Sequence, residues 1–322
     1  MTANKEKSIK TVSLVMPAYN EEDNIAAFFA ECLAKLDRVF DYEYIFVNDG
    51  SQDKTGEQIK RLIQDYPDQA ITGINFSRNF GKEAAILAGL KEAQGDYISL
   101  IDVDLQQDPI YINQMLRELE DDPDLDMVAC YQDQRKEKKL VAGLKSLFYD
   151  LIDKMSDRPF AKNASDFRTF RRELAEAIIA MPEYHRFSKG LFSWIGFKTA
   201  YLPYQVKDRL HGKTSWSFKG LVKYALEGFF GFSVVPLKLA TYLGFFTSLA
   251  AILYFIYIVL HKLIVGISVK GYATIVCLIL LLSGVQLICM GIIGEYLART
   301  YLESKQRPHY IIKNRIKGNG PS

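Results

Sequence analysis

The sequence predicts an α/β protein in which a Rossmann-like, mostly parallel sheet is followed by amphipathic helices and a two-helix transmembrane hairpin. Strand-length apolar runs alternate with segments of helical period from residue 11 to about residue 132. Polar residues directly follow four of those runs, and two long segments near the C-terminus contain no charged residue. Alternation of strands and helices is typical of a parallel sheet with helices on both faces.

The expected strands and helices of this sheet lie in the first 132 residues. No Gly-x-Gly-x-x-Gly sequence follows the first strand, which argues against a nicotinamide or flavin site. The apolar runs occupy residues 11–19, 42–48, 71–77, 97–101 and 127–131, and the helical segments occupy residues 23–36, 55–64, 82–94 and 110–120.

Four polar segments should meet at one edge of the sheet, because ligands of parallel sheets bind at the carboxyl ends of the strands. After the apolar run that ends at Ile101, Asp102 and Asp104 place two carboxylates where the chain turns. Such oxygen ligands suit Mg²⁺ or Mn²⁺, which share their coordination sphere with waters and substrate phosphates. The alternative is a solvated acidic turn before a helix that starts near Pro109. The other segments are Pro17-Ala18-Tyr19-Asn20-Glu21, Asn48-Asp49-Gly50-Ser51 and Ser77-Arg78-Asn79-Phe80-Gly81-Lys82.

Beyond residue 132 the chain becomes basic and then amphipathic. Residues 140–155 carry apolar side chains at helical spacing, which fits either a helix packed on the sheet or a helix at a bilayer surface. A short helix over 173–181 and a strand-like run over 195–202 follow. Residues 217–232 form a second expected amphipathic helix, whose Lys and aromatic residues are typical of a membrane interface.

The composition argues against several other classes of protein. The net charge of +2 and the pI of about 8.1 give no indication of nucleic-acid binding. The four cysteines show no metal-ligand spacing and fit a reducing compartment, and the four scattered histidines argue against a zinc site. The polar first ten residues lack the apolar core of a cleaved signal peptide.

Two uncharged segments, residues 239–260 and 271–294, are each long enough to cross a bilayer. Their connection is short, so the pair should form a helical hairpin. Six Lys and Arg residues follow Tyr296, against the single acid Glu303, whereas the connection carries only two lysines. The positive-inside rule therefore places the tail and the large N-terminal domain in the cytoplasm.

In order and spacing, the four polar segments resemble those of glycosyltransferase family 2, whose catalytic domain has the GT-A fold. The hairpin and the Ser165-Asp166-Phe167-Arg168 segment resemble the polyisoprenyl-phosphate glycosyltransferases. That branch includes the bactoprenol glucosyltransferases and the dolichol-phosphate mannose synthases. The resemblance covers about residues 13–307 and implies a nucleotide-sugar donor and an inverting transfer.

The resemblance also implies roles for individual residues. Asp102 and Asp104 would hold the metal, and Asp104, Asp166 and Arg209 are the expected catalytic residues, with Asp166 at the position of the family's candidate base. Arg209 would meet the diphosphate or the acceptor phosphate. The expected donor-binding residues are Pro17, Tyr19, Glu21 and Asp49 at the base and ribose, Arg78 and Lys82 at the phosphates, Asp102 and Gln106 at the metal, and Arg135 and Lys213 at the diphosphate or the acceptor phosphate.

Three of these residues could instead have a purely structural role. Asp49 could form only a turn with Gly50, Arg78 could pair with a helix carboxylate, and Asp166 could orient Arg168. The chemistry itself limits the need for a base. A departing nucleoside diphosphate is negative, so cations should carry most of the catalysis. An acceptor phosphate, with a second pKa of about 6, is already anionic at neutral pH. We therefore expect Asp166 to matter more for positioning than for proton removal.

The predicted function is inverting, Mg²⁺- or Mn²⁺-dependent transfer of a sugar, with UDP-glucose as the first donor to test, onto undecaprenyl or another polyisoprenyl phosphate. The product would serve cell-envelope glycan modification. One alternative is a non-catalytic scaffold or flippase partner, and another is a GDP-mannose-using enzyme similar to the dolichol-phosphate mannose synthases. A processive polysaccharide synthase is disfavoured, because the chain lacks a Gln-x-x-Arg-Trp motif and has only two expected spans.

The expected location is the plasma (inner) membrane, with two spans and with the catalytic domain and both termini in the cytoplasm. Small residues such as Gly284, Gly291 and Gly294 would allow hairpins to pack closely in a homo-oligomer. The expected parts are a polar tail (1–10), the glycosyltransferase domain (11–210), an interfacial juxtamembrane helix (211–236), the transmembrane hairpin (237–297) and a basic cytoplasmic tail (298–322).

Overall fold

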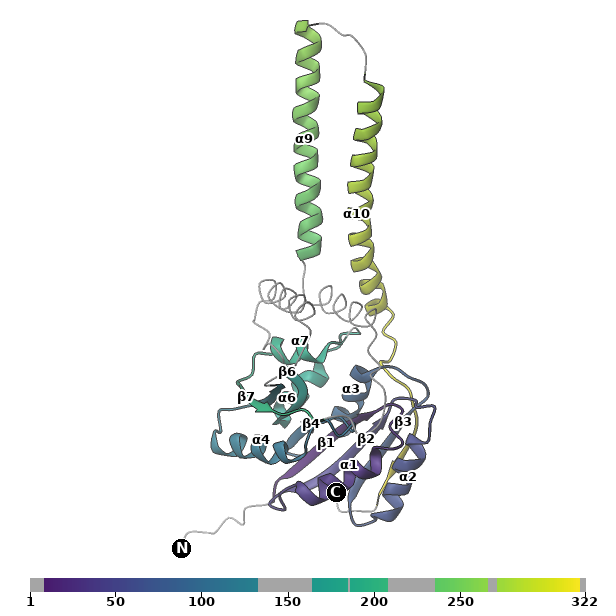
Figure 1. Cartoon of the computed structure of the whole chain (residues 1–322), viewed down its shortest axis with the longest axis vertical. Coiled ribbons are helices and arrows are strands. Elements are labelled where there is room, and N and C mark those ends of the chain that lie inside the picture. The colour runs from purple at the N-terminus through teal and green to yellow at the C-terminus, as the bar shows by residue number, and fades with distance from the viewer. Residues whose placement is uncertain (1–8, 133–163, 185, 208–234, 266–270, 319–322) are drawn as a thin grey trace. The chain divides into compact units, whose positions relative to one another are not determined.

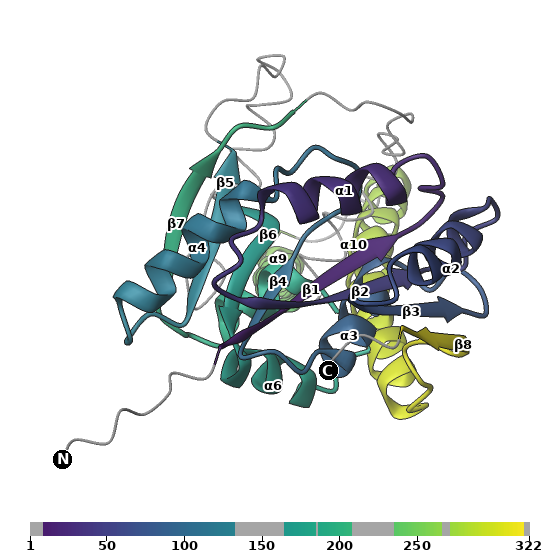
Figure 2. The ribbon, with the colours of Figure 1, turned by 90° about the horizontal axis from the view of Figure 1, so that it is seen from below.

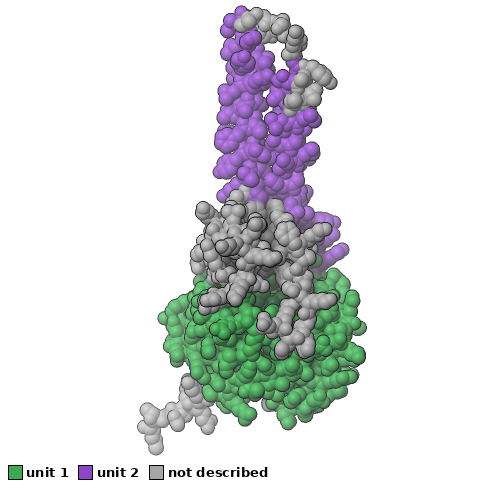
Figure 3. All heavy atoms as spheres, viewed as in Figure 1, with its two compact units in different colours: residues 1–220, 308–322 green, residues 221–307 purple. Residues whose placement is uncertain are grey.

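A computed structural model of the 322-residue chain describes residues 9–132, 164–184, 186–207, 235–265 and 271–318. The chain divides into two compact units, residues 1–220 with 308–322 and residues 221–307 (Figure 3). The first unit carries a sheet and the second carries two long helices (Figure 1). Several sequence predictions lie outside the described residues: the amphipathic helices over 140–155 and 217–232, and the side chains of Arg135, Arg209 and Lys213.

The first unit is built on one eight-stranded sheet. Its strands are β1 (Thr11–Ala18), β2 (Asp41–Asn48), β3 (Ala70–Phe76), β4 (Tyr97–Leu100), β5 (Met127–Gln132), β6 (Ala164–Arg171), β7 (Thr199–Tyr204) and β8 (Ile312–Lys317). The spatial order is β7-β5-β6-β4-β1-β2-β3-β8. The neighbours β4-β1-β2-β3 at its centre are parallel, as are β5 and β7, whereas β6 and β8 run antiparallel to their neighbours. The predicted α/β fold with a mostly parallel sheet is confirmed.

Helices cover both faces of this sheet. They are α1 (Ile25–Lys35), α2 (Thr55–Asp65), α3 (Lys82–Glu92), α4 (Ile110–Asp121), α6 (Arg172–Ala180) and α7 (Ser188–Trp194). Figure 2 shows α1 and α2 on one side of the sheet and α3 and α6 on the other. The alternation of side chains along β1 explains this layering.

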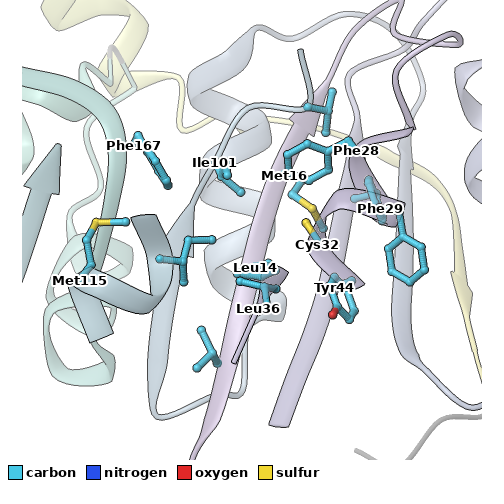
Figure 4. Close-up of a cluster of buried hydrophobic side chains, with 14 of the residues drawn as sticks. Leu14, Met16, Phe28, Phe29, Cys32, Leu36, Tyr44, Ile101, Met115 and Phe167 are labelled. Carbon is cyan, nitrogen blue, oxygen red and sulfur yellow. The ribbon is translucent and has the colours of Figure 1, made fainter. Parts of the chain in front are cut away.

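Along β1, Leu14 and Met16 join a buried cluster with Phe28 and Phe29 of α1 (Figure 4). Val15 points to the opposite face, where α3 approaches so closely that a Cβ atom added at Gly89 would overlap the Val15 side chain. The two apolar faces of β1 thus fix a helix layer on each side. This arrangement leaves the carboxyl ends of the parallel strands free to carry polar residues.

Three parts of the sheet differ from the predicted elements. The strand-like run at 195–202 is divided, because α7 ends at Trp194, Gly196 has a positive φ of 76° and β7 begins only at Thr199. Strand β6 contains the Ser165-Asp166-Phe167-Arg168 segment, for which the sequence did not predict a strand. Strand β8 lies in the segment predicted as a tail. Three of its residues are Lys or Arg, so its sequence does not have the apolar pattern of a strand. Pairing with β3 stabilises it.

The second unit contains α9 (Val235–Val265) and α10 (Tyr272–Ser304). Each has a stretch long and apolar enough to cross a membrane, Pro236–Ile258 in α9 and Leu278–Ser304 in α10. Large apolar side chains on both helices are exposed, such as Phe246 at 63% and Ile293 at 53%, and large exposed apolar surfaces mark sites of interaction with proteins or membranes. Helix α10 continues past the predicted end at residue 294 and includes an ion pair one turn apart, Arg299 with Glu295 at 3.2 Å.

Candidate active site

A small hollow lies where β1 and β4 end. Three charged side chains reach it from different parts of the fold: Lys82 from the start of α3, Asp102 from the loop after β4, and Asp166 from β6. The remaining lining residues are Pro17, Ile86, Leu100, Ile101 and Gln107. The hollow therefore brings together Pro17, Lys82 and Asp102 from three of the segments predicted to meet at this edge, and Asp166 of β6 joins them.

Lys82 is the centre of this charged group. Its Nζ lies 2.6 Å from Oδ1 and 2.8 Å from Oδ2 of Asp102, and 3.2 Å from Oδ2 of Asp166. Burial by itself lowers the pKa of Lys82, but the two carboxylates raise it above its ordinary value. The ammonium is therefore a permanent positive charge between two acids.

Asp166 is held in its ionised form. Burial by itself raises its pKa, but the nearby cations Lys82, Lys189 and Arg168 together lower it below its usual range. Arg168 is buried and donates to the main-chain carbonyls of Ser165 (2.8 Å) and Asp166 (3.4 Å). Asp166 thus contacts Arg168 through its main-chain carbonyl, whereas its carboxylate forms an ion pair with Lys82.

The loop after β4 is held from inside by Gln107, a buried residue that the sequence analysis did not identify. Its Oε1 accepts the main-chain N–H of Asp102 at 3.0 Å, and its Nε2 donates to Oδ2 of Asp102 at 3.1 Å. Gln106, the neighbour expected at the metal, donates its main-chain N–H to Oδ1 of Asp104 at 3.2 Å. Only the fold distinguishes the two glutamines, because they are adjacent and chemically identical.

The same loop contains a strained residue and is held from outside. Leu105 is buried with a positive φ of 61°, a conformation that costs a branched side chain roughly 1–3 kcal/mol. The main-chain N–H of Lys207 donates to the carbonyl of Gln106 at 3.1 Å, and the Lys207 ammonium lies 2.7 Å from Oδ2 of Asp108. Strain of this kind clusters at functional sites.

Asp49 positions the loop that delivers Lys82. Its two carboxylate oxygens accept the main-chain N–H groups of Phe80 (2.7 Å) and Gly81 (2.9 Å). Burial raises the pKa of Asp49 above its ordinary value, although both hydrogen bonds oppose that shift. Gly50 has a positive φ of 63°, and an added Cβ would overlap the main chain of Arg78. The Asp49-Gly50 turn is therefore also the support of a neighbouring loop.

The remaining described candidates, Tyr19, Arg78 and Glu21, are not among the residues that line the hollow. Tyr19 is exposed, and the Arg78 guanidinium stacks 3.9 Å from the Phe80 ring centroid. Within the part of the chain that the structure describes, Arg78 forms no ion pair with a helix carboxylate. Glu21 accepts from Asn24 Nδ2 at 2.6 Å, so it also organises the start of α1.

Two further residues near the cluster were missed by sequence reasoning. Glu83 is half-buried and accepts both the main-chain N–H (3.0 Å) and the hydroxyl of Ser188, which fixes the start of α7. Lys189, which follows Ser188 in α7, interacts electrostatically with Asp166. Burial lowers the pKa of Lys189. The basic residues Arg186 and Lys189 are visible in the sequence. Their charge alone does not predict that this segment lies near Asp166 of β6.

The donor set fits a hard divalent cation. No group of three or more His, Cys, Asp or Glu side chains among the described residues could hold a metal alone. Mg²⁺ typically uses only one or two carboxylates and takes its other ligands from water and substrate phosphates. Asp102 and Asp104, on one loop beside the hollow, match that requirement.

Two protein-family models match this chain. The model described as Glycosyl transferase family 2 matches residues 13–179, and the model described as GtrB C-terminal hairpin matches residues 235–300. The chain belongs to glycosyltransferase family 2. The first match spans β1 to α6 and so contains Lys82, Asp102 and Asp166.

Curated relatives extend the similarity of this family 2 glycosyltransferase over nearly its whole length. It is 39% identical to the prophage bactoprenol glucosyl transferase homolog of Escherichia coli strain K12, over 95% of this chain and 99% of the relative. It is 38% identical to the bactoprenol glucosyl transferase of Shigella phage SfV, over 94% of this chain and 98% of the relative. The putative glycosyltransferase CsbB of Bacillus subtilis is 39% identical, over 94% of this chain and 91% of the relative.

Among solved structures, glucosyl-3-phosphoglycerate synthase from Mycobacterium tuberculosis in complex with phosphoglyceric acid is similar at 17% identity. That similarity covers 67% of this chain and 76% of the other, with a TM-score of 0.46. The family and the curated relatives establish the chain as a glycosyltransferase with a GT-A catalytic domain and two helices that could span a membrane.

Proposed function

We propose that this glycosyltransferase transfers a sugar, with inversion, from a nucleotide sugar to undecaprenyl phosphate or a related polyisoprenyl phosphate. UDP-glucose is the first donor that we propose. The observation that supports this proposal is that one chain contains both the Lys82–Asp102–Asp166 cluster and a segment that matches the GtrB C-terminal hairpin. The same chain is 38% identical to a protein named bactoprenol glucosyl transferase. The product would supply cell-envelope glycan modification.

In the proposed reaction a phosphate oxygen of the lipid attacks the anomeric carbon. The bond from that carbon to the diphosphate breaks, and its electron pair leaves with the nucleoside diphosphate. A divalent cation held by Asp102 and Asp104 would supply positive charge to the diphosphate. Lys82, beside Asp102, adds a second positive charge that is already in place before the donor binds, so no reorganisation is needed as charge develops.

Asp166 is proposed as a positioning group. Its pKa is lowered and its carboxylate pairs with Lys82, which are properties of a group that keeps a charge in place. The phosphate nucleophile needs no proton removed, because it is already anionic at neutral pH. Asp166 would therefore orient Lys82 between donor and acceptor. Arg135, Arg209 and Lys213 are proposed to bring together the two anionic substrates.

We propose that the hairpin crosses the bilayer twice, and the order of the chain supports this. Strand β8 comes after α9 and α10 in sequence, yet it pairs with β3 in the catalytic sheet. Both ends of the helical unit thus connect to the same domain, which supports an even number of crossings. The Lys- and Arg-rich residues after Tyr296 support a cytoplasmic side for that domain and for both termini.

The experiment that tests this proposal is a donor panel with purified protein and undecaprenyl phosphate, read by product mass. UDP-glucose, UDP-GlcNAc, UDP-galactose and GDP-mannose are compared with Mg²⁺, with Mn²⁺ and with EDTA. We expect a hexosyl monophosphate lipid, with the highest turnover from UDP-glucose in the presence of metal. Turnover of GDP-mannose alone would replace the proposed donor. Absence of metal-dependent turnover with every donor would overturn the proposal.

A further inference from the structure

The segment that follows α10 contacts the loop that carries Lys82. This loop, Ser77–Lys82, leads from β3 into α3, and β8 lies antiparallel to β3 at the edge of the sheet. The main-chain N–H of Ser77 donates to the carbonyl of Ile311 at 3.0 Å. The last ladder pair before the loop, Phe76 with Ile312, follows a register shift. The loop therefore begins directly beside the residues that enter β8.

An aromatic series continues this contact into the loop. The ring of Tyr310 stacks on Phe76, with centroids 4.9 Å apart and planes at 10°. Phe76 is buried and meets Phe80 edge to face at 5.8 Å and 89°. Phe80 in turn donates its main-chain N–H to Asp49. The conformation that delivers Lys82 is thus supported by Asp49 on one side and by Tyr310, through Phe76, on the other.

Strand β8 also holds the far end of α3. Glu92, the last residue of that helix, accepts ion pairs from Arg315 (3.1 Å) and Lys317 (2.9 Å), and its side chain is only 10% exposed. One strand thus fixes both the loop before α3 and the end of α3. Lys82 is the first residue of this helix, so its position depends on both contacts.

We propose that the strand after the hairpin is a positioning element of the donor site, and that Tyr310 keeps the Ser77–Lys82 loop in the conformation that binds the donor. The proposal rests on the proposed function in assigning this loop to the donor. Tyr310 touches no reacting group, so it acts through Phe76. Loss of an aromatic stack of this kind corresponds to about a 2- to 10-fold change in an equilibrium constant.

The test uses the full-length protein and three variants: Tyr310→Ala, Tyr310→Phe and Lys313→Gln. Tyr310→Phe keeps the stacked ring, and Lys313→Gln alters an exposed side chain of β8, the strand that follows Tyr310. We expect Tyr310→Ala to raise the KM for UDP-glucose about 2- to 10-fold, with little change in kcat or in the KM for undecaprenyl phosphate. Both control variants should remain close to the unaltered protein.

Hydrogen exchange provides a readout that does not depend on activity. The amide of Ser77 and the peptide that covers residues 77–82 should exchange faster in Tyr310→Ala and at the original rate in Tyr310→Phe. If Tyr310→Ala does not fold, Tyr310→Leu removes the flat ring while retaining apolar volume. The proposal is overturned if loop exchange and donor KM are unchanged, or if all variants lose donor and lipid affinity equally.

The two proposals can fail separately. If the unaltered protein does not use UDP-glucose, the proposed donor is wrong, and the KM comparison is made with the donor that the panel identifies. The exchange comparison stands in either case, because it measures the loop itself. Faster exchange in Tyr310→Ala without any effect on the KM of the working donor would contradict the positioning role.

Discussion

The ammonium of Lys82 lies 2.6 Å from a carboxylate oxygen of Asp102, the residue expected to hold the metal. Both groups meet at the edge of the sheet, although they lie 20 residues apart. The same ammonium reaches Asp166 at 3.2 Å, so one lysine links the expected metal loop to β6.

Replacement of Lys82 should therefore lower activity more than it lowers stability. We expect Lys82→Met to lose roughly 100- to 1,000-fold in kcat, the range for loss of one preorganised group that stabilises transition-state charge. Steady-state kinetics with a fixed lipid concentration measure this effect. Lys198→Met is the matched control, because Lys198 forms an exposed ion pair with Asp122 at 2.9 Å. Equal losses in the two variants would contradict the role of Lys82.

Asp166 and Asp102 should differ in their importance. Asp166→Asn keeps the size of the side chain and removes only its charge, so we expect a loss of roughly 10-fold in kcat. Asp102→Ala removes a proposed metal ligand, and we expect activity near background. The acid limb of the rate–pH profile should persist near pH 6 in Asp166→Asn, because it reports the acceptor phosphate. Loss of activity in Asp166→Asn as complete as in Asp102→Ala, with donor binding intact, would contradict the ranking of positioning over proton removal for Asp166.

Asp108 should contribute stability that depends on pH. Burial by itself raises its pKa, but hydrogen bonds from Lys207 and Lys35 lower it below its ordinary value. A carboxyl whose pKa is lower in the folded protein stabilises the fold above its unfolded-state pKa, about 3.9, and loses this effect as the pH falls through the folded-state value. We expect Asp108→Asn to be less stable by about 1 kcal/mol at pH 7, because Lys207 is partly exposed.

Thermal unfolding of the purified protein at several pH values measures this difference. The gap between Asp108→Asn and the unaltered protein should shrink as the pH falls below 4. Asp122→Asn is the control, since its partner Lys198 is well exposed. A gap that stays constant across the pH range would mean that the Asp108 side chain acts through packing and not through its charge.

Gly50 should not tolerate a side chain. Its φ of 63° disfavours other residues, and an added Cβ would overlap the main chain of Arg78. We expect Gly50→Ala to destabilise the fold by roughly 1–3 kcal/mol and to weaken donor binding, because the loop that carries Lys82 must move. Melting temperature and donor KM measure the two effects. Gly244→Ala is the control, as a Cβ there meets no atom within 4 Å. Unchanged donor affinity in Gly50→Ala would separate this turn from the site.

Removal of divalent cations should stop turnover and leave the fold intact. EDTA is expected to abolish product formation, and Mg²⁺ or Mn²⁺ to restore it. Asp104→Asn should need roughly 10- to 100-fold more metal for half-maximal rate, because it replaces one of two carboxylates with a neutral amide. A metal titration of initial rates measures this shift. Full activity in EDTA would exclude the proposed roles of Asp102 and Asp104 at the metal.

Much of the fold follows from local patterns. The five apolar runs in the first 132 residues all form strands, and the uncharged segments near the C-terminus form α9 and α10. These elements are recognisable because each buries or exposes a continuous apolar face. Strand β8 is not recognisable in this way, since Lys313, Arg315 and Lys317 alternate along it. Its identity depends on β3 and on Glu92, which lie more than 200 residues earlier in the chain.

The sequence by itself determined the α/β fold class, the order of the polar segments and the presence of two long apolar helices, because these depend on composition and period within short windows. Only the tertiary structure decided which polar residues meet. Gln107 rather than Gln106 holds Asp102, and Lys82 bridges Asp102 and Asp166. Distances between side chains from separate strands depend on sheet order and register, and a linear pattern contains neither.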